Sequence, residues 1–318
     1  MALTNRQIFN KQTRISATEL LAQQVEKFNA ASGGAIVLRS ASNPGDYAEE
    51  ALVSYTANLV RRRNVYSTSS PSKVVIAEVL KTSVKVAAGT PPVEMDPHIA
   101  SWIGENPTKA GIIVGEQLAK DSMADMLNTS LGAATAALVT EASNLYDYSD
   151  TGKLTLGAIN EGSRTMGDAY DSVTCLVMHS TPWFDIISAN LTNSTSLFTF
   201  GTVNIRTDAL GRPIILTDSS GLVTSGPTRY YTLGLVPGAI MVEDNGDYEQ
   251  VMVDGTGGES ITRTMQAEWS WNLGLKGFTW DKSNGGHSPS TAALITGSNW
   301  DKIATSAKDL AGFVVKSQ

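Results

Sequence analysis

The segment ENPTKAGIIVGEQLAKDSMADMLNTSLGAATAALVTE, residues 105–141, predicts one unusually long helix, which is the strongest indication of the fold in this chain. Asn106 is a residue type that caps helices, and Pro107 suits the first helical position. Apolar residues recur at gaps of mostly three and four, which places them on one helical face: Leu118, Met123, Met126, Leu127, Leu131, Ala134 and Leu138. Such a helix would be about 55 Å long, well beyond the usual length of about three or four turns.

This pattern favours a strut that lies along a sheet over a coiled coil. The heptad is not sustained, and the C-terminal half of the segment is rich in alanine. Gly111, Gly115 and Gly132 weaken the helix, since glycine is a poor helix former. Two ordinary core helices, separated at one of these glycines, remain the alternative.

The N-terminal residues 1–34 are polar, with apolar residues at a spacing that predicts a short amphipathic helix. These residues are Leu20, Leu21, Val25 and Phe28, and Gly33 and Gly34 follow them as a stop. A segment with so little apolar surface of its own favours an arm that reaches away from the body. A plain N-terminal helix packed on its own domain fits the same pattern, so both interpretations stay open.

Between this segment and the strut, the sequence predicts a strand, a helix and then extended structure. Residues 35–39 have the length of a short strand, and residues 47–59 are predicted as a helix that runs into three arginines. Residues 66–95 are rich in valine, which suits strands, and the turn at residues 89–92 interrupts them. A pair of strands here could project from the body or be folded into a sheet.

Beyond the strut, the sequence alternates between helices and short strands. A loop at 143–152 precedes a predicted helix at 154–164 and a predicted strand at 173–178. A further helix begins near Thr181 and is predicted to bury Trp183, Phe184, Ile186 and Ile187. Turn residues predict three hairpins, which pair 202–206 with 213–217, 230–235 with 239–242, and 261–271 with 275–280. A last amphipathic stretch covers 300–315.

The stretch CLVMHSTPWFDII, residues 175–187, holds residue types that hydrolases use, but in an unsuitable arrangement. A Ser-His-Asp triad needs residues brought together in space and a nucleophile on a strained turn. His179 and Ser180 are adjacent, and no G-x-S-x-G surrounds Ser180. We predict that Ser180 caps the next helix and that Cys175, inside an apolar run, acts as a small hydrophobe.

No metal or cofactor site is predicted either. His98, His179 and His287 are far apart in the sequence and none forms H-x-x-x-H. The acidic residues 243–247 lack the spacing of a calcium loop and are predicted to form a solvated turn. Residues 255–258 are rich in glycine, but no Lys-Ser/Thr follows them, as a phosphate loop requires. We therefore predict a structural protein with no catalytic residue, metal or cofactor.

Composition narrows the class of partner. A net charge of −7 argues against a dedicated nucleic-acid binder, although a mildly acidic wall suits a container of nucleic acid. Charged residues make up only 17% of the chain, which fits a surface largely covered by neighbouring subunits and also fits a lightly charged monomer. The single cysteine and the lack of a signal-peptide core or a long apolar run predict folding in a reducing cytoplasm, with no membrane partner.

Several short phrases, taken in order, resemble the major capsid proteins of tailed bacteriophages, which have the Hong Kong 97-type fold. They are residues 166–168 and 176–180, then 211–218, and then 230–234 with 237–239. Coat proteins of this kind commonly pass from such a strand and helix into a hairpin that begins Gly-Arg-Pro. This chain departs from the pattern by one extra residue, Leu216. The resemblance extends from near residue 35 to the end of the chain.

The resemblance implies an α+β chain of the Hong Kong 97-type capsid fold. Residues 1–34 would form an N-terminal arm, and 35–95 its continuation and an extended loop that reaches onto a neighbour. Residues 96–153 would form the peripheral domain with its spine helix. Residues 154–260 would form the axial domain, and 261–318 would return to the peripheral domain.

The function implied by the resemblance is that of a major capsid protein. It would self-assemble as pentamers and hexamers into an icosahedral shell around double-stranded DNA, which it would meet only by non-specific proximity. A separate scaffolding protein is implied, because no long helical scaffold-like domain precedes the arm, together with a portal and possible decoration proteins. We expect the chain in the virion capsid, after synthesis in the host bacterial cytoplasm.

Two other classes of protein fit parts of the sequence. An enzyme of unrecognised type, such as a hydrolase that uses His179 or His287, would be a monomer or small oligomer with a conventional pocket. A β-rich virion cement or tail component would lack the central strut. For the capsid hypothesis, the candidate inter-subunit or wall-facing residues are cations: Arg61, Arg62, Arg63, Lys73, Lys81 and Lys85.

Overall fold

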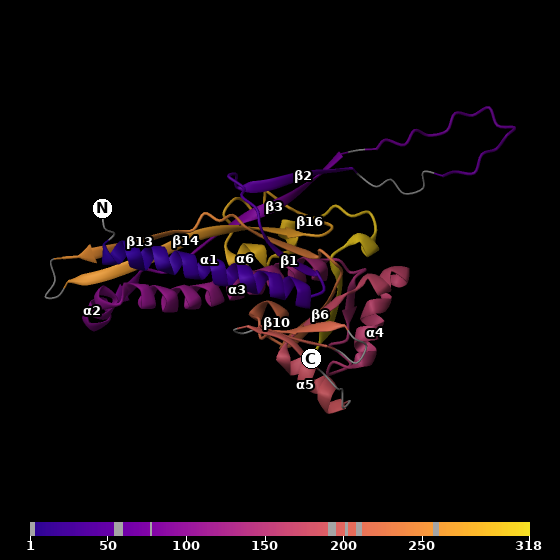
Figure 1. The fold of residues 1–318 in the computed structure, drawn as a ribbon. Helices are drawn as coiled ribbons and strands as arrows, with labels where there is room; N and C mark the ends of the chain where they lie inside the picture. The colour runs from indigo at the N-terminus through magenta and orange to yellow at the C-terminus, as the bar shows by residue number, and fades with distance from the viewer. Residues whose placement is uncertain are drawn as a thin grey trace.

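The computed structural model describes residues 4–53, 60–76, 78–189, 195–200, 203–207, 212–256 and 261–318. These residues form two large sheets and a pair of long helices that lie side by side (Figure 1). The helices are α1 (Asn5–Ala31), α2 (Pro97–Glu105), α3 (Pro107–Thr140), α4 (Leu156–Arg164), α5 (Ser180–Ala189) and α6 (Thr291–Leu294).

The first sheet has the strand order β1-β12-β14-β3-β2, and β13 and β4 also pair with β14. Its strands are β1 (Ile36–Ser40), β2 (Tyr47–Val53), β3 (Glu78–Gly89), β4 (Val93–Met95), β12 (Ile240–Asp244), β13 (Glu249–Gly255) and β14 (Thr262–Leu275). The residues of β14 alternate between buried and exposed near Met265 and are all buried from Ser270 onward. The sheet is therefore open on one face at its β13 end and covered on both faces at the other.

Helices α1 and α3 run along one face of this sheet (Figure 1). The long helix predicted from the sequence is confirmed as one continuous element of 34 residues, α3. Asn106 does not cap it through its side chain, although Pro107 occupies the first turn as predicted. Asn106 also ends α2, and its backbone N–H bonds to the carbonyl of Trp102 in that helix.

The glycines that weaken α3 do not break it, because they serve helix packing. A Cβ atom at Gly111 would lie 2.9 Å from the carbonyl oxygen of Phe9, and one at Gly115 would lie 2.7 Å from that of Thr13. Both acceptors belong to α1, so the two helices touch at backbone distance. Helix α1 is longer than the predicted amphipathic helix, and it lies on its own chain. Gly33, at φ +66°, follows it in the left-handed region, as a helix stop requires.

The second sheet has the order β5-β17-β11-β6-β9-β8-β7, with β10 paired to β11. Its strands are β5 (Leu145–Asp147), β6 (Cys175–Met178), β7 (Thr195–Phe200), β8 (Val203–Thr207), β9 (Pro213–Leu216), β10 (Val223–Thr224), β11 (Arg229–Leu235) and β17 (Gly312–Ser317). Helices α4 and α5 flank this sheet, which lies at the far end of α3 from α2 (Figure 1). A small third sheet pairs β15 (Phe278–Trp280) with β16 (Trp300–Lys302).

One continuous apolar core joins the two sheets. It combines the C-terminal half of α3, including Leu138, with Trp271 and Leu273 of the first sheet and Phe313 of the second. A second, smaller cluster lies at the other end of the molecule, where Phe9 and Met265 pack together with Met95, Ile103 and Ala110. The large core therefore belongs to the end where the sheets meet.

The helix predicted at residues 47–59 is wrong for the part that the structure describes. Residues 47–53 form β2, which pairs antiparallel with β3, and residues 54–59 lie outside the described part of the chain. Glu50 lies directly opposite Lys81 in this pairing, and opposite charges across a strand pair stabilise it. Long-range pairing has overridden the helix propensity of a segment rich in Ala and Glu.

Of the three predicted hairpins, one is confirmed. β8 and β9 are antiparallel neighbours, although their connection at 208–211 lies outside the described residues. The second is wrong, because β11 belongs to the second sheet and β12 to the first. The third is wrong because β14 continues through Asn272, which is fully buried and bonded to Asn245. The predicted amphipathic stretch 300–315 forms β16, a turn and most of β17, and Phe184 of α5 is 63% exposed rather than buried.

Candidate assembly surfaces

A segment without regular structure, residues 60–76, extends away from the body beyond β2 and β3 (Figure 1). We call it the projecting segment. Every one of its residues is exposed, and Val60 and Tyr66 are 93% and 96% exposed. Its other large apolar residues are Val65, Val74, Val75 and Ile76. Fully burying a Val or Ile side chain stabilises by about 1.5–3 kcal/mol, so an apolar segment in water is typical of a surface that another molecule covers.

The six predicted inter-subunit cations all lie on the unit formed by β2, the projecting segment and β3. Arg61, Arg62, Arg63 and Lys73 are exposed on the projecting segment, which is not the helix end expected for the arginines. Lys81 and Lys85 are half-buried on β3, where they alternate with the buried residues Thr82, Val84 and Val86. The structure thus brings the six cations into one part of the molecule, and their inter-subunit role stays a prediction.

The opposite end of the molecule also exposes apolar side chains. Val251 and Val253 of β13 are 49% and 59% exposed on a face of the sheet that carries no helix. On the helical side of the same end, α2 exposes Ile99 and Trp102 and the start of α3 exposes Ile112 and Ile113. Sequence reasoning missed these residues, because their exposure depends on which face of each element the fold leaves bare.

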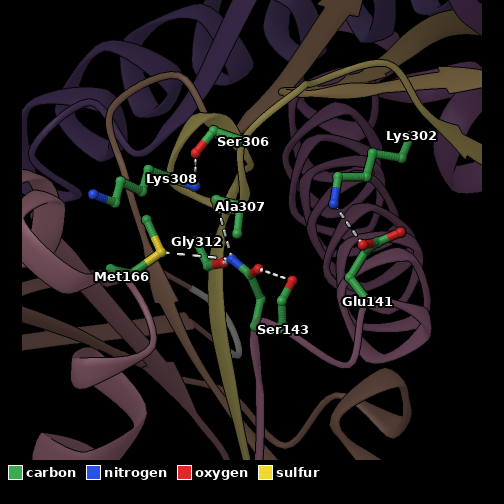
Figure 2. A network of polar contacts seen from close by, with 9 residues as sticks. Glu141, Ser143, Met166, Lys302, Ser306, Ala307, Lys308 and Gly312 are labelled. Carbon is green, nitrogen blue, oxygen red and sulfur yellow. Dashed lines mark hydrogen bonds and ion pairs between the residues drawn. The ribbon is translucent and has the colours of Figure 1, made fainter. Parts of the chain in front are cut away.

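The C-terminal end of α3 is tied to the second sheet by a buried polar network centred on Asn144. The Nδ2 group of Asn144 donates to the carbonyl oxygens of Gly312 at 2.7 Å and Ala307 at 3.0 Å, and lies 3.5 Å from the Sδ atom of Met166. The Asn144 backbone carbonyl accepts from the N–H of Val314 at 2.8 Å. Figure 2 shows Met166, Ala307 and Gly312 converging beside an ion pair of 2.8 Å between Lys302 and Glu141.

This network fixes the second sheet relative to the long helix. Asn144 is fully buried, and its amide group is satisfied by backbone carbonyls from the last strand and the turn before it. Buried, fully bonded polar groups specify one arrangement, because any displacement leaves them without partners. This role could not be predicted from the sequence, since residues 143–152 have the composition of an ordinary polar loop.

The stretch around His179 is the start of a helix. The Nδ1 atom of His179 accepts the backbone N–H of Thr181 at 3.2 Å, so His179, and not Ser180 as predicted, supplies the capping side chain. Its Nε2 atom lies 3.5 Å from Asp218, and its ring packs on Tyr230 with centroids 5.1 Å apart. Burial raises the pKa of the Cys175 thiol to about 12, which keeps it protonated and apolar, as predicted.

The acidic residues 243–247 do not form the predicted solvated turn. Glu243 is buried and pairs with Arg39, and the Nδ2 group of Asn245 donates to the Ser270 hydroxyl at 2.9 Å. Asp247 accepts the backbone N–H of Ser270 at 2.7 Å. Burial, with Asp247 nearby, raises the pKa of Asp244 above its ordinary value. The hydrogen bonds of this segment therefore hold the end of β12 against β14.

In the described part of the chain, no group of three or more His, Cys, Asp or Glu side chains is placed to hold a metal ion. His98 lies in α2, His179 precedes α5 and His287 precedes α6, so the three histidines remain separate. No helix among the described residues is long and apolar enough to cross a membrane. The long helix α3 counts against the β-rich cement or tail hypothesis, which required its absence.

Comparison with known proteins gives one family and several solved structures. Residues 5–314 match the family described as major capsid protein 13-like. The chain is similar to the holo-SrpI encapsulin complex of Synechococcus elongatus PCC 7942, with a TM-score of 0.50 and 11% identity over 87% of this chain and 84% of that chain. No curated protein matches the chain.

Two structures from bacteriophages are also similar. The chain from Mycobacterium phage Adephagia has a TM-score of 0.49 and 9% identity, over 91% of this chain and 89% of that chain. The capsid of Ralstonia phage GP4 has a TM-score of 0.47 and 8% identity, over 90% of this chain and 87% of that chain. At such identities the likeness to the encapsulin shows a shared fold alone.

The family match settles the class of protein. It spans nearly the whole chain and covers every helix and all but the end of the last strand. The hydrolase hypothesis for His179 is therefore wrong, and the predicted α+β fold of the Hong Kong 97 type is confirmed. The chain belongs to the major capsid protein 13-like family, as a structural, non-enzymatic component of tailed-bacteriophage capsids.

Proposed function

We propose that copies of this chain assemble as pentamers and hexamers into a closed icosahedral shell that encloses double-stranded DNA. The observation that carries the proposal, beyond the family, is the projecting segment, which combines large apolar side chains with four cations and is exposed at every residue in a single copy. Such a surface is typical of a site that another molecule covers.

The fold suits a thin wall. Helices α1 and α3 support one face of the first sheet, and their close packing at Gly111 and Gly115 makes a stiff plate. In this proposal, residues 96–153 and 261–318 form the peripheral domain and 154–260 the axial domain, whose second sheet would meet its copies around the capsomer axis. Residues 35–95 would form the continuation of the arm and the extended loop. Residues 1–34 would form the N-terminal arm, which lies along α3 and does not reach away from the body.

The proposed capsid has three further protein partners and packaged DNA. A scaffolding protein would guide curvature, a portal would occupy one vertex, and decoration proteins would bind outside the shell. A chain of net charge −7 would hold packaged DNA by confinement and not by specific contacts, because like charge keeps the wall from adhering to its contents. Synthesis in the host bacterial cytoplasm, where Cys175 stays reduced, completes the proposal.

Sedimentation of the protein expressed in bacteria, alone and with the scaffolding protein of its own phage, tests this function. We expect fast-sedimenting material that electron microscopy shows as closed particles or rings of five and six copies. A chain that sediments as a monomer in every condition, including with scaffold, would refute the proposal.

A further inference from the structure

Residues 279–286, the end of β15 and the turn after it, contact both strands that lead to the projecting segment. We call these residues the brace loop. Thr279 bonds to β3 and Lys282 pairs with β2, across separations of 197 and 233 residues along the chain. The tertiary fold therefore brings a C-terminal loop to the base of the ribbon that β2 and β3 form.

Thr279 continues the first sheet where β14 stops. In the described register, β14 pairs with β3 from Val84 to Gly89, so it does not reach the half of β3 nearer the projecting segment. There the Oγ1 atom of Thr279 accepts the backbone N–H of Thr82 at 2.8 Å, and the hydroxyl donates to the carbonyl of Leu80 at 3.4 Å. One side chain thus satisfies two backbone groups that a further strand would otherwise bond.

Lys282 holds the other strand of the ribbon. Its ammonium group pairs with Glu49 of β2 and lies 5.2 Å from the centre of the Tyr47 ring. The side chains of Lys282 and Glu49 are 42% and 44% exposed, so water and salt weaken this pair. Thr82, by contrast, is buried. The brace loop therefore makes a shielded contact with β3 and a reversible one with β2.

The brace loop is itself fixed to the body. Trp280 is buried, packs edge-on against Trp300 with ring centroids 4.9 Å apart, and donates its Nε1–H to a carbonyl of the loop at 2.9 Å. A Cβ atom at Gly285 would lie 2.2 Å from the Trp280 ring, so the turn closes tightly over the indole. The Asp281 carboxylate accepts two backbone N–H groups of the turn. These contacts fix where Lys282 stands relative to the core.

The ribbon loses its burial at the brace loop. Every residue of β2 from Glu49 onward is exposed, and β3 has its first buried residue at Thr82. Beyond this point the two strands lead to the projecting segment (Figure 1). A ribbon of two strands is only marginally stable alone, so its direction depends on how its base is held.

We propose that Thr279 and Lys282 form a clamp that sets the direction in which the ribbon carries the projecting segment away from the body. Thr279 is the fixed point, because its contact replaces strand pairing. The Lys282–Glu49 pair is a reversible stop, and its opening lets the ribbon pivot while the subunit stays folded. The role of the clamp in assembly rests on the proposed function, since rings of five and six copies present neighbours at different angles.

Distances between two spin labels in the unassembled chain test the reversible stop. Cysteines replace Leu52 at the end of β2 and Glu26 on α1, and the buried Cys175 stays unlabelled. We expect Lys282→Gln to broaden the distance distribution by about twofold, because the charge is lost and the side-chain length is kept.

Two further variants control this measurement. The exchange of Lys282→Glu with Glu49→Lys should return the width to within about 1.5-fold of the wild type, because the pair is restored with reversed charges. Lys27→Gln removes an exposed lysine from α1 and should leave the width unchanged. An unchanged width in Lys282→Gln, or no recovery in the exchange, would overturn the stop.

Hydrogen exchange at the Thr82 amide tests the fixed point. Thr279→Val removes the acceptor at nearly constant volume and should speed exchange of this amide by about tenfold, whereas Thr279→Ser keeps the hydroxyl and should preserve the protection. Equal protection in the two variants would overturn the assignment of Thr279.

Particle diameter links the clamp to assembly. We expect Lys282→Gln to form shells of more than one diameter under conditions where the wild type forms one, and the charge exchange to restore a single diameter. A single wild-type diameter from Lys282→Gln would overturn this link. A wild-type chain that stays monomeric even with scaffold would overturn the proposed function, whereas the label distances and the Thr82 exchange would still decide the clamp.

Discussion

At the scale of single residues, glycine and asparagine hold the large elements of this subunit together. Gly115 allows the backbones of α1 and α3 to touch, and Asn144 joins the end of α3 to the last strand of the second sheet. Neither residue carries an apolar side chain. The rigidity of the subunit therefore depends on a few contacts that would tolerate no extra atom or lost hydrogen bond.

Replacing Gly115 with valine should loosen α1. Its Cβ atom would fall 2.7 Å from the Thr13 carbonyl, so the helices must separate, at a cost of about 1–3 kcal/mol. We expect faster hydrogen exchange throughout α1. The control Gly104→Ala, in α2, adds its methyl group to open space and should leave exchange in α1 unchanged. Equal protection of α1 in both variants would contradict the packing described.

Replacing Asn144 with alanine should destabilise the subunit by about 1–3 kcal/mol for each buried carbonyl left unsatisfied. Two carbonyls, those of Ala307 and Gly312, lose their side-chain donor. Urea unfolding of the unassembled chain measures the loss. The control Asn284→Ala removes an exposed side chain bonded to Asp281 and should cost less than about 0.5 kcal/mol. Similar midpoints for the two variants would refute the role of the network.

The pH dependence of stability should carry the signature of Asp244. Burial raises the pKa of this carboxyl above its ordinary value of 3.8, so its protonated form contributes stability that is fully present below the unfolded-state pKa and is lost as pH rises through the folded-state pKa. At neutral pH the charge costs stability. Asp244→Asn keeps the acceptor for the Gly246 N–H and should raise the Tm at pH 7 but change it little at pH 3. A lower Tm at pH 7, or an equal gain from the exposed Asp301→Asn, would contradict this.

At the scale of elements, the long helix and the projecting segment have opposite roles. Helix α3 contributes to both the main core and the smaller cluster, whereas the projecting segment contributes to neither. The stability of the single subunit and the stability of the assembly therefore depend on different elements. A change in the projecting segment should alter assembly and leave the stability of the subunit unchanged.

Replacing residues 60–76 with a short Gly-Ser linker separates the two roles. Every residue removed is exposed, so the Tm of the unassembled chain should stay within a few degrees of the wild type. Assembly should fail, because the cations and apolar side chains that neighbours would bury are gone. Thermal melting and sedimentation measure the two effects. Normal particle yield from the shortened chain would show that the projecting segment is dispensable.

The elements that local sequence specifies were predictable, and those that distant pairing specifies were not. The apolar periodicity and the length of residues 105–141 are visible in the sequence, so helix α3 could be predicted without tertiary information. Residues 47–53 have helix-forming composition and become β2 only because β3 pairs with them. β14 passes through Asn272 because Asn245, from another strand, satisfies its buried amide.

The candidate surfaces divide in the same way. The run of three arginines is visible in the sequence, and its exposure follows from its charge. The exposed face of β13 is not visible in the sequence, since it depends on the register that sets Glu249 opposite Glu268 and Val251 opposite Gln266. A shift of one residue in β13 would turn its valines toward the helices, so only the folded sheet identifies them.

At the scale of the whole molecule, the subunit is a plate whose two ends are built from different elements and expose different surfaces. The projecting segment and the second sheet extend from one side of the α1–α3 pair, and β13, β14 and α2 from the other (Figure 1). Weak contacts at both ends, repeated over many copies, sum to a stable shell while each still permits correction during assembly. The apolar and charged surfaces left open on one copy are consistent with such repetition.

Cryo-electron microscopy of particles assembled from the wild-type chain tests this account most directly. We expect a closed shell in which the density for residues 60–76 lies against a neighbouring copy. A compact, solitary subunit, or a shell in which those residues remain in open solvent, would contradict it.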